Sequence, residues 1–348
     1  MPLRLDDLEL IVSIPVDRWV EVDTELGERL DRFVRAGLLL SDGEDPLLVE
    51  FRARDETLTA ASWNVYSALY YSIMRWRDVD TEEPPEGDPE LMLEESYRDF
   101  VSAAGPAPTH FYRAAPDSRA IALPLERREG ALYELLLRRR STRSFDPVPL
   151  PLATLGTILY YAFGCQGIAT YAGGALSLVR KTSPSGGGLH PVEVYPLILR
   201  VEGLDQGIYH YAIGDHTLEP LQTISLSEAE AWTSEFTIGQ RYFGSAQALF
   251  VLTARFDRAQ WKYRNDDRIV ASASMDAAHL SQTFYLLCEE LGLGACITAA
   301  LNVENIEARL GLEVFREGVL AICVCGTTGP LDLSLHPVFA DYTPRSLS

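Results

Sequence analysis

The segment Thr182-Ser183-Pro184-Ser185-Gly186-Gly187-Gly188-Leu189-His190-Pro191 stands directly before an apolar run, residues 194–201, that predicts a buried strand. Three consecutive glycines carry no side chains, so a planar ligand or a second stretch of backbone can come close to the chain here. The segment is neither a dinucleotide fingerprint nor a P-loop, because it lacks the glycine spacing of both. Taken alone, it fits an ordinary loop as well as a ligand site.

A second unusual segment, Arg139-Arg140-Ser141-Thr142-Arg143-Ser144-Phe145-Asp146, follows a predicted helix over residues 130–140. Together with Arg138 it gathers arginines in a chain where 50 acidic residues outnumber 30 basic ones. Guanidinium groups with hydroxyls between them can bind a phosphate through charge-assisted hydrogen bonds. The alternative is a solvated helix end, where positive charges interact favourably with the helix dipole.

The elements expected around these segments indicate an α+β fold, because long helices occur together with strands joined by hairpins. Apolar residues at three- and four-residue spacing predict helices over 130–140, 151–162 and 274–291. Short apolar runs predict buried strands over 194–201, 248–254 and 320–325, and a hairpin over 208–212 and 216–221.

The composition of the 348 residues predicts four parts. They are an N-terminal module over 1–78, an acidic, proline-rich linker over 79–127 with a short helix at 90–103, an α+β domain over 128–335, and a tail over 336–348.

The N-terminal module resembles a winged helix in outline. Residues 28–36 predict a short helix that ends near Gly37. Residues 38–40 and 47–51 flank Ser41-Asp42-Gly43-Glu44-Asp45-Pro46 and predict a hairpin. Because no basic face accompanies this helix and hairpin, we expect a protein or peptide partner rather than DNA.

Charge and cysteine content exclude several classes of protein. A formal charge of -20 argues against general nucleic-acid binding, because phosphate contacts need a basic surface. No apolar run is long enough for a transmembrane helix, and the N-terminus lacks the features of a signal peptide. The five cysteines fit a reduced compartment better than a disulfide framework. We therefore expect a soluble cytoplasmic protein without a membrane partner.

No metal-binding pattern such as HExxH or paired CxxC occurs in the sequence. Cys323 and Cys325 are two residues apart in a predicted strand, so they would share one face of the sheet, and we expect both in the core. His190 and His279 are expected to be hydrogen-bonded structural residues. We expect no metal site.

The order of the segments resembles that in nitroreductase-like flavoproteins, and among them the SagB-type dehydrogenases, which oxidise thiazolines and oxazolines in ribosomal peptides. The resemblance covers about 128–328. It rests on Arg139-x-Ser141-x-Arg143-x-Phe145, Pro184-Ser185-Gly186-Gly187, Leu189-His190-Pro191-Val192-Glu193-Val194-Tyr195, Gly207-Ile208-Tyr209-His210-Tyr211, and a helix over 275–291 that runs into Gly292-Leu293-Gly294-Ala295-Cys296.

The resemblance implies an FMN cofactor at the interface of a homodimer, in an antiparallel sheet wrapped by helices. By analogy, the phosphate and ribityl chain would be held by Arg139, Arg140, Ser141 and Arg143. The flavin would be approached from the partner subunit by Pro184, Ser185, Gly186 and Gly187, and its ring would pass near Ile297, Thr298, Ala299 and Ala300. Nitroreductases often place another basic residue after the last strand, whereas this chain has Gly326-Thr327-Thr328.

The resemblance also implies a catalytic role for Lys262 and Tyr263, which match the lysine-tyrosine pair of the azoline dehydrogenases. Aromatising an azoline removes a proton and a hydride from neighbouring ring atoms. A lysine can accept the proton when burial lowers its pKa, and the flavin takes the hydride. The alternative is a charged loop in which Lys262 and Arg264 pair with Asp266 and Asp267.

Three hypotheses for the function follow. The favoured one is an FMN-dependent dehydrogenase that converts azolines to azoles in a ribosomally made precursor peptide, with a cyclodehydratase complex as a possible partner. The second is an NAD(P)H-dependent reductase of small nitro compounds or quinones. The third is a flavin-free scaffold that binds the precursor peptide in a maturation complex.

Overall fold

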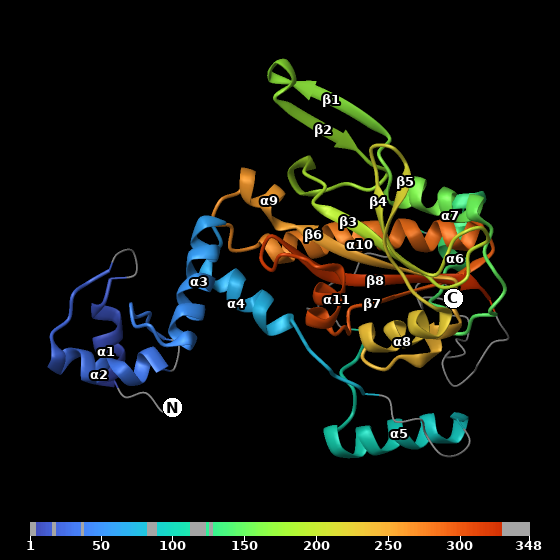
Figure 1. Ribbon diagram of the computed structural model, residues 1–348. Coiled ribbons are helices and arrows are strands. Elements are labelled where there is room, and N and C mark those ends of the chain that lie inside the picture. The colour runs from blue at the N-terminus through green and yellow to red at the C-terminus, as the bar shows by residue number, and fades with distance from the viewer. Residues whose placement is uncertain are drawn as a thin grey trace.

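The protein is built on a six-stranded antiparallel sheet, as the computed structural model shows (Figure 1). The structure describes residues 5–15, 19–35, 38–81, 89–111, 123–124 and 128–328. The strand order is β5-β4-β3-β6-β8-β7. The strands are β3 (Val192–Ile198), β4 (Gly207–Ala212), β5 (Thr217–Thr223), β6 (Ala248–Arg255), β7 (Leu293–Thr298) and β8 (Glu317–Thr327).

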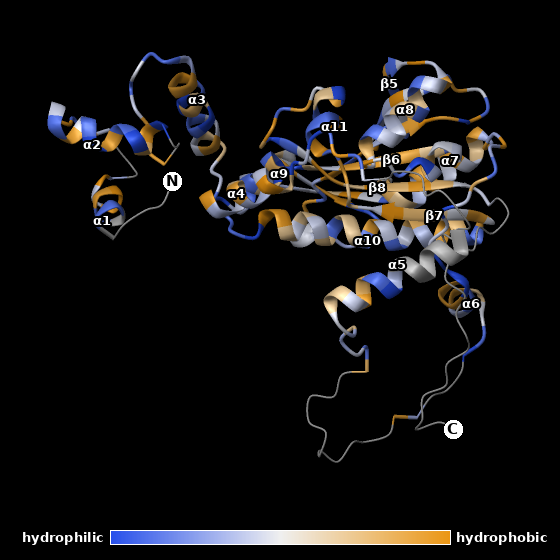
Figure 2. Cartoon of the chain, turned by 90° about the horizontal axis from the view of Figure 1, so that it is seen from below, coloured by the Kyte–Doolittle hydropathy of each residue, from blue (hydrophilic) through white to orange (hydrophobic). Residues whose placement is uncertain are grey.

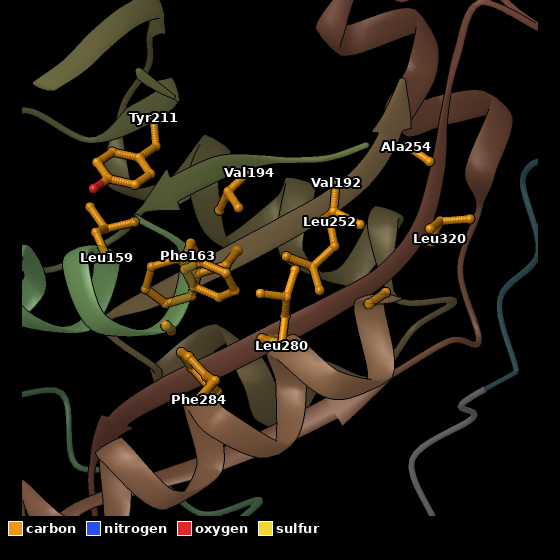
Figure 3. Close-up of a cluster of buried hydrophobic side chains, with 14 of the residues drawn as sticks. Leu159, Phe163, Val192, Val194, Tyr211, Leu252, Ala254, Leu280, Phe284 and Leu320 are labelled. Atoms are coloured by element: carbon orange, nitrogen blue, oxygen red, sulfur yellow. The ribbon is translucent and has the colours of Figure 1, made fainter. Parts of the chain in front are cut away.

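Helices cover both faces of this sheet, which is why its central strands are apolar throughout. One face packs against α10 (Ile269–Glu290), and the opposite face against α8 (Leu226–Phe236) and α11 (Val303–Leu310) (Figure 2). Side chains of β6 alternate between the two layers: Phe250 packs with Phe284 of α10, and Leu249 packs on the α8 side. Figure 3 shows Phe163, Leu280 and Phe284 meeting the strands in the α10 layer.

The α+β fold and most of the expected elements are confirmed. The expected helices correspond to α6 (Ala131–Arg138), α7 (Leu152–Ile158) with the π-helical turn η1 (Leu159–Phe163), and α10. The expected hairpin is β4–β5, and Cys323 and Cys325 are both buried in the α10 layer, as predicted. A second hairpin, β1 (Gly167–Tyr171) with β2 (Leu176–Arg180), extends from the body and was not expected (Figure 1).

The N-terminal region is helical, and the hairpin expected within residues 38–51 is wrong. The described helices there are α1 (Leu5–Ser13), α2 (Thr24–Arg35), α3 (Pro46–Ala60) and α4 (Val65–Met74). Residues 47–51 lie in α3, because the Asp45 side chain accepts a hydrogen bond from the Leu47 N–H at 2.9 Å and Pro46 occupies the first turn. The Asp-Pro pair therefore begins a helix, and the described part of this region contains no wing.

Two other expectations for the N-terminal third are confirmed. Residues 28–35 of the helix expected over 28–36 lie within α2, where Leu30 and Phe33 are buried, and residue 36 lies outside the described residues. The helix expected at 90–103 is α5 (Pro89–Ala104). The tail over 336–348 lies outside the described residues. None of the helices in the described ranges is long and apolar enough to cross a membrane.

Helix α4 packs on the sheet body through Tyr71, which is fully buried. Its hydroxyl donates a hydrogen bond to Glu307 of α11 at 2.5 Å, and Trp63 donates from Nε1 to the Phe315 carbonyl at 2.7 Å. A Cβ at Gly318 would lie 1.8 Å from the Tyr71 hydroxyl, so only glycine fits beneath it. Residues 63–74 are thus part of the core of the α+β domain.

We expect Tyr71→Ala to destabilise the protein by about 3–5 kcal/mol, because it opens a large cavity and leaves buried Glu307 with one donor fewer. The matched control is Tyr70→Ala on the same helix, where the side chain is 54% exposed and the expected change is within about 0.5 kcal/mol. Urea unfolding measures both. Equal effects of the two variants would contradict the packing of α4 on the sheet.

Candidate functional site

The arginine-rich segment and the chain after the long helix meet at the hydroxyl of Tyr285. This hydroxyl lies 2.9 Å from Ser141 Oγ and accepts a hydrogen bond from the Ile297 N–H at 3.0 Å. The Arg139 guanidinium lies 5.4 Å from the centre of the Tyr285 ring. The sequence segments predicted to hold a phosphate and to pass a flavin ring are therefore neighbours in space.

The arginines of this segment differ in their surroundings. Arg138 pairs with Glu289 at 3.1 Å, so its charge is compensated. Within the described part of the chain, no carboxylate lies within ion-pair distance of Arg139 or Arg140. The Thr142 N–H donates to the Ala295 carbonyl at 2.7 Å and fastens the segment to β7. The combination of a fixed backbone and uncompensated guanidinium groups is suited to an anion.

Ile297 and Thr298, the first two residues predicted to pass the ring, end β7, and the chain turns after them at Ala299 and Ala300. The Thr298 hydroxyl accepts hydrogen bonds from the Ala300 N–H at 3.2 Å and from Gln240 Nε2 at 3.1 Å. Thr298 is buried, whereas Ala299 is exposed. The Thr298 hydroxyl therefore shapes the turn, and Ala299 lies at its surface.

The glycine segment lies against the other end of α10. Asp276 accepts a hydrogen bond from Ser185 Oγ at 2.5 Å and another from the Gly186 N–H at 3.0 Å. Because an α-helix rises 1.5 Å per residue, Asp276 and Tyr285 are about 13 Å apart along α10. Within one chain, the glycine segment and the arginine segment therefore occupy separate places.

Lys262 and Tyr263 lie against the glycine segment. They end α9 (Phe256–Lys262), and Lys262 Nζ donates a hydrogen bond to the Gly187 carbonyl at 3.1 Å. A Cβ at Gly187 would lie 2.4 Å from the Tyr263 hydroxyl. In the described part of the chain, neither Lys262 nor Arg264 forms an ion pair with Asp266 or Asp267. The structure thus brings together two segments that are far apart in the sequence, and the alternative of a self-paired charged loop is wrong.

Gly187→Ala is expected to destabilise the protein more than Gly188→Ala, by about 0.5–1 kcal/mol, because only the first adds a clash and the exposed Tyr263 side chain must move aside. Both glycines have positive φ, at 63° and 69°, so both variants carry a similar backbone cost, but no atom lies within 4 Å of a Cβ at Gly188. Chemical unfolding of the pair isolates the contact with Tyr263. Equal losses of stability would show that Tyr263 does not press on Gly187.

Lys181 is a site residue that the sequence analysis missed. It is only 7% exposed, and its ammonium has no hydrogen-bond or ion-pair partner among the described residues. It lines a small pocket with Ser185, His190 and Asp276, large enough for a single water-sized group. Burial lowers the pKa of Lys181 to about 8, although the nearby carboxylate of Glu193 opposes this shift. A lone lysine in a polar stretch gives no signal of burial.

We expect Lys181→Met to stabilise the protein at pH 7 by up to about 3 kcal/mol. The pKa of Lys181 is about 8 in the folded protein, whereas its ordinary value is 10.5. Below pH 8 the folded protein therefore carries the full free-energy cost of burying the ammonium. The cost falls as the pH rises from 8 to 10.5, where the unfolded lysine also loses its proton. Urea unfolding from pH 6 to 10.5 measures this, with exposed Lys262→Met as the control. A destabilised Lys181→Met at pH 7 would contradict an unpaired charge.

The model of the Nitroreductase family matches residues 136–327, which is more than half of the chain. The chain belongs to the nitroreductase family. The antiparallel sheet wrapped by helices, expected from the resemblance, is thereby confirmed.

Known relatives include both nitroreductase-named and peptide-processing proteins. MJ1384 from Methanocaldococcus jannaschii, whose name assigns it to the nitroreductases, is 27% identical over 57% of this chain and 93% of its own length. The trifolitoxin-processing protein TfxB from Rhizobium leguminosarum is 28% identical over 51% of this chain, and the microcin B17-processing protein McbC from Escherichia coli is 27% identical over 39%. The matches span 48% of TfxB and 50% of McbC, about half the length of each. A chain of the E. coli microcin synthetase McbBCD complex has a TM-score of 0.47 and 20% identity, over 70% of this chain and 95% of that chain.

Proposed function

We propose that this protein is an FMN-dependent oxidoreductase that modifies a ribosomally made peptide, and specifically a dehydrogenase that converts azolines to azoles. The observation that carries the proposal is the Lys262–Tyr263 pair held against Gly187. The names of TfxB and McbC, which are processing proteins, support a peptide substrate. We propose in addition a maturation complex with a cyclodehydratase as partner. Helices α1–α3 are proposed to dock the precursor peptide or that partner.

The residues near Tyr285 fit the phosphate of FMN. Arg139 and Arg140 lack carboxylate partners in the described structure, and the Ser141 hydroxyl lies beside them. In a chain with a formal charge of -20, arginines without carboxylate partners are unusual. We propose that these residues and Arg143 hold the phosphate, and that residues 297–300 line the ring. Bound FMN supplies a hydride acceptor.

The distance along α10 between the glycine segment and the arginine segment supports a homodimeric site. A glycine segment about 13 Å from the arginine segment along α10 is poorly placed to contact the same ring in one chain. We propose that Pro184, Ser185, Gly186 and Gly187 of one subunit complete the cofactor site of the other.

In this proposal Lys262 is the proton acceptor. The Lys262 side chain is exposed, so the burial expected from the sequence is not found within one chain, and it lies beside a pocket lined by Gly186, Leu189, Ala259, Tyr263, Ser272 and Asp276. This pocket holds little more than a water-sized group, so a substrate ring would lie at its mouth and lose the proton on one carbon to Lys262 Nζ as the hydride leaves the neighbouring atom. Tyr263 would orient the ring through its hydroxyl and its aromatic face.

The composition of the chain supports amine chemistry at this site. Only two of the 30 basic residues are lysines, Lys181 and Lys262, and both lie at the glycine segment. Arginine stays protonated at accessible pH, whereas lysine can release its proton and act as a base. Both lysines of the chain therefore lie where an amine could act on a group bound at the glycine segment.

The experiment that tests the proposal compares Lys262→Ala with Arg264→Ala, a neighbouring exposed cation. We expect purified protein to release FMN on denaturation, and both variants to retain it. Lys262→Ala should lower azoline turnover by about 10²–10⁴-fold, the usual contribution of a general base, and Arg264→Ala should not. A fully active Lys262→Ala would remove this lysine from the mechanism.

The second candidate is an NAD(P)H-dependent nitro- or quinone-type reductase, which the match over 93% of MJ1384 favours. Rapid NAD(P)H oxidation with quinones, together with no turnover of azoline peptides, would select this function. Protein that takes up no FMN would contradict both candidates.

A further inference from the structure

The carboxylate of Asp276 is the anchor of the whole glycine segment. Asp276 lies early in α10 and is 5% exposed. Its Oδ2 accepts from Ser185 Oγ and its Oδ1 accepts from the Gly186 N–H. Ser185 Oγ in turn accepts from the His190 N–H at 2.9 Å. One carboxylate therefore fixes both ends of the turn that contains Gly187 and Gly188.

The same turn holds the proposed catalytic pair on its other side. Lys262 Nζ donates to the Gly187 carbonyl, and the Tyr263 hydroxyl lies where a Gly187 Cβ would be. The structure gives Asp276 no hydrogen bond to either residue of the pair. Any effect of Asp276 on Lys262 must pass through the backbone of residues 185–187.

Lys181 supplies the charge that faces this carboxylate. It shares a pocket with Ser185 and Asp276, and it lies beyond ion-pair distance of both Asp276 and Glu193. Asp276 and Glu193 each act on it through their charge, as does Arg258 from α9. Asp276 forms no ion pair among the described residues, so its polar contacts there are the two hydrogen bonds to the glycine turn.

We propose that Asp276 is a positioning residue: it fastens the glycine turn to α10 and thereby sets Lys262 and Tyr263 in place. The assignment rests on the proposed function for its catalytic consequence. The mechanical coupling of Asp276 to Lys262 does not depend on that function.

The test measures the acylation of Lys262 by a water-soluble amine reagent, followed by mass spectrometry. Lys181 is the only other side-chain amine in the chain, so each product is assigned without overlap. Losing one anchoring hydrogen bond is worth roughly 1 kcal/mol, so Ser185→Ala and Asp276→Asn should each raise the Lys262 labelling rate about fivefold. Asp276→Ala, which removes both bonds, should raise it further.

Turnover of the flavin-loaded enzyme gives the second readout. We expect Asp276→Ala to lower kcat by about tenfold or more with a smaller change in KM, because a small misplacement of a reacting group slows the chemical step. Asp276→Asn keeps one acceptor for the Gly186 N–H and should recover part of the loss. The matched control is Ser274→Ala in the same helix, whose hydroxyl bonds only the Val270 carbonyl; it should change neither readout.

Urea unfolding of Asp276→Ala separates positioning from structural support. A purely structural role predicts that turnover falls only as far as the folded population does, whereas positioning lowers the turnover of protein that is fully folded. Unchanged Lys262 labelling in folded Asp276→Asn and Ser185→Ala would overturn the proposal, whatever the activity. Increased labelling in a protein without dehydrogenase activity would instead uphold the coupling and reject the proposed function.

Discussion

The rigid rise of one buried helix, α10, sets the distance between the two polar anchors of the site. Asp276 holds the glycine segment and Tyr285 holds Ser141 and Ile297, while Leu280 and Phe284 between them pack into the core beneath the sheet. A helix packed in this way cannot shorten, so the two anchors cannot approach each other. Any ligand that needs both must be long enough to span them or must lie between two chains. The dimeric arrangement that we propose is the second of these two solutions.

The sequence predicted the sheet body well because its signals are local and strong. The run at 248–254 could be placed as β6, and its alternation between two cores follows once helices cover both faces. The hairpin at 38–51 failed because Asp45-Pro46 can close a turn or begin a helix, and the N-cap bond from Leu47 decides for the helix. The β1–β2 hairpin escaped notice because its residues are mostly exposed and lack an apolar repeat.

For the site, the sequence predicted residues but not the contacts between them. The resemblance assigned Ser141, Ile297 and Gly187 to the cofactor site and Lys262 to catalysis. Only the fold shows that Tyr285 joins Ser141 to Ile297 and that Lys262 donates a hydrogen bond to Gly187. The surroundings of Asp276 and Lys181 could not be found from sequence, because they depend on contacts across long sequence separations. The use of lysine at just two positions singles out Lys181 but does not show that it is buried.

Two buried polar side chains near the glycine segment suggest that this region is kept at a cost in stability. Lys181 has no charge partner within ion-pair distance, and both polar atoms of Gln260 on α9 lack a hydrogen-bond partner in the described structure. A buried amide left unsatisfied costs about 1–3 kcal/mol, and leucine would fill the same volume without that cost. Gln260 precedes Lys262 in the same short helix, so the element that presents the proposed base is less firmly held than the sheet behind it. Local opening occurs first where stability is lowest. In the proposed enzyme, α9 would be the adaptable side of the site, and the turn that Asp276 fastens to α10 would be its rigid side.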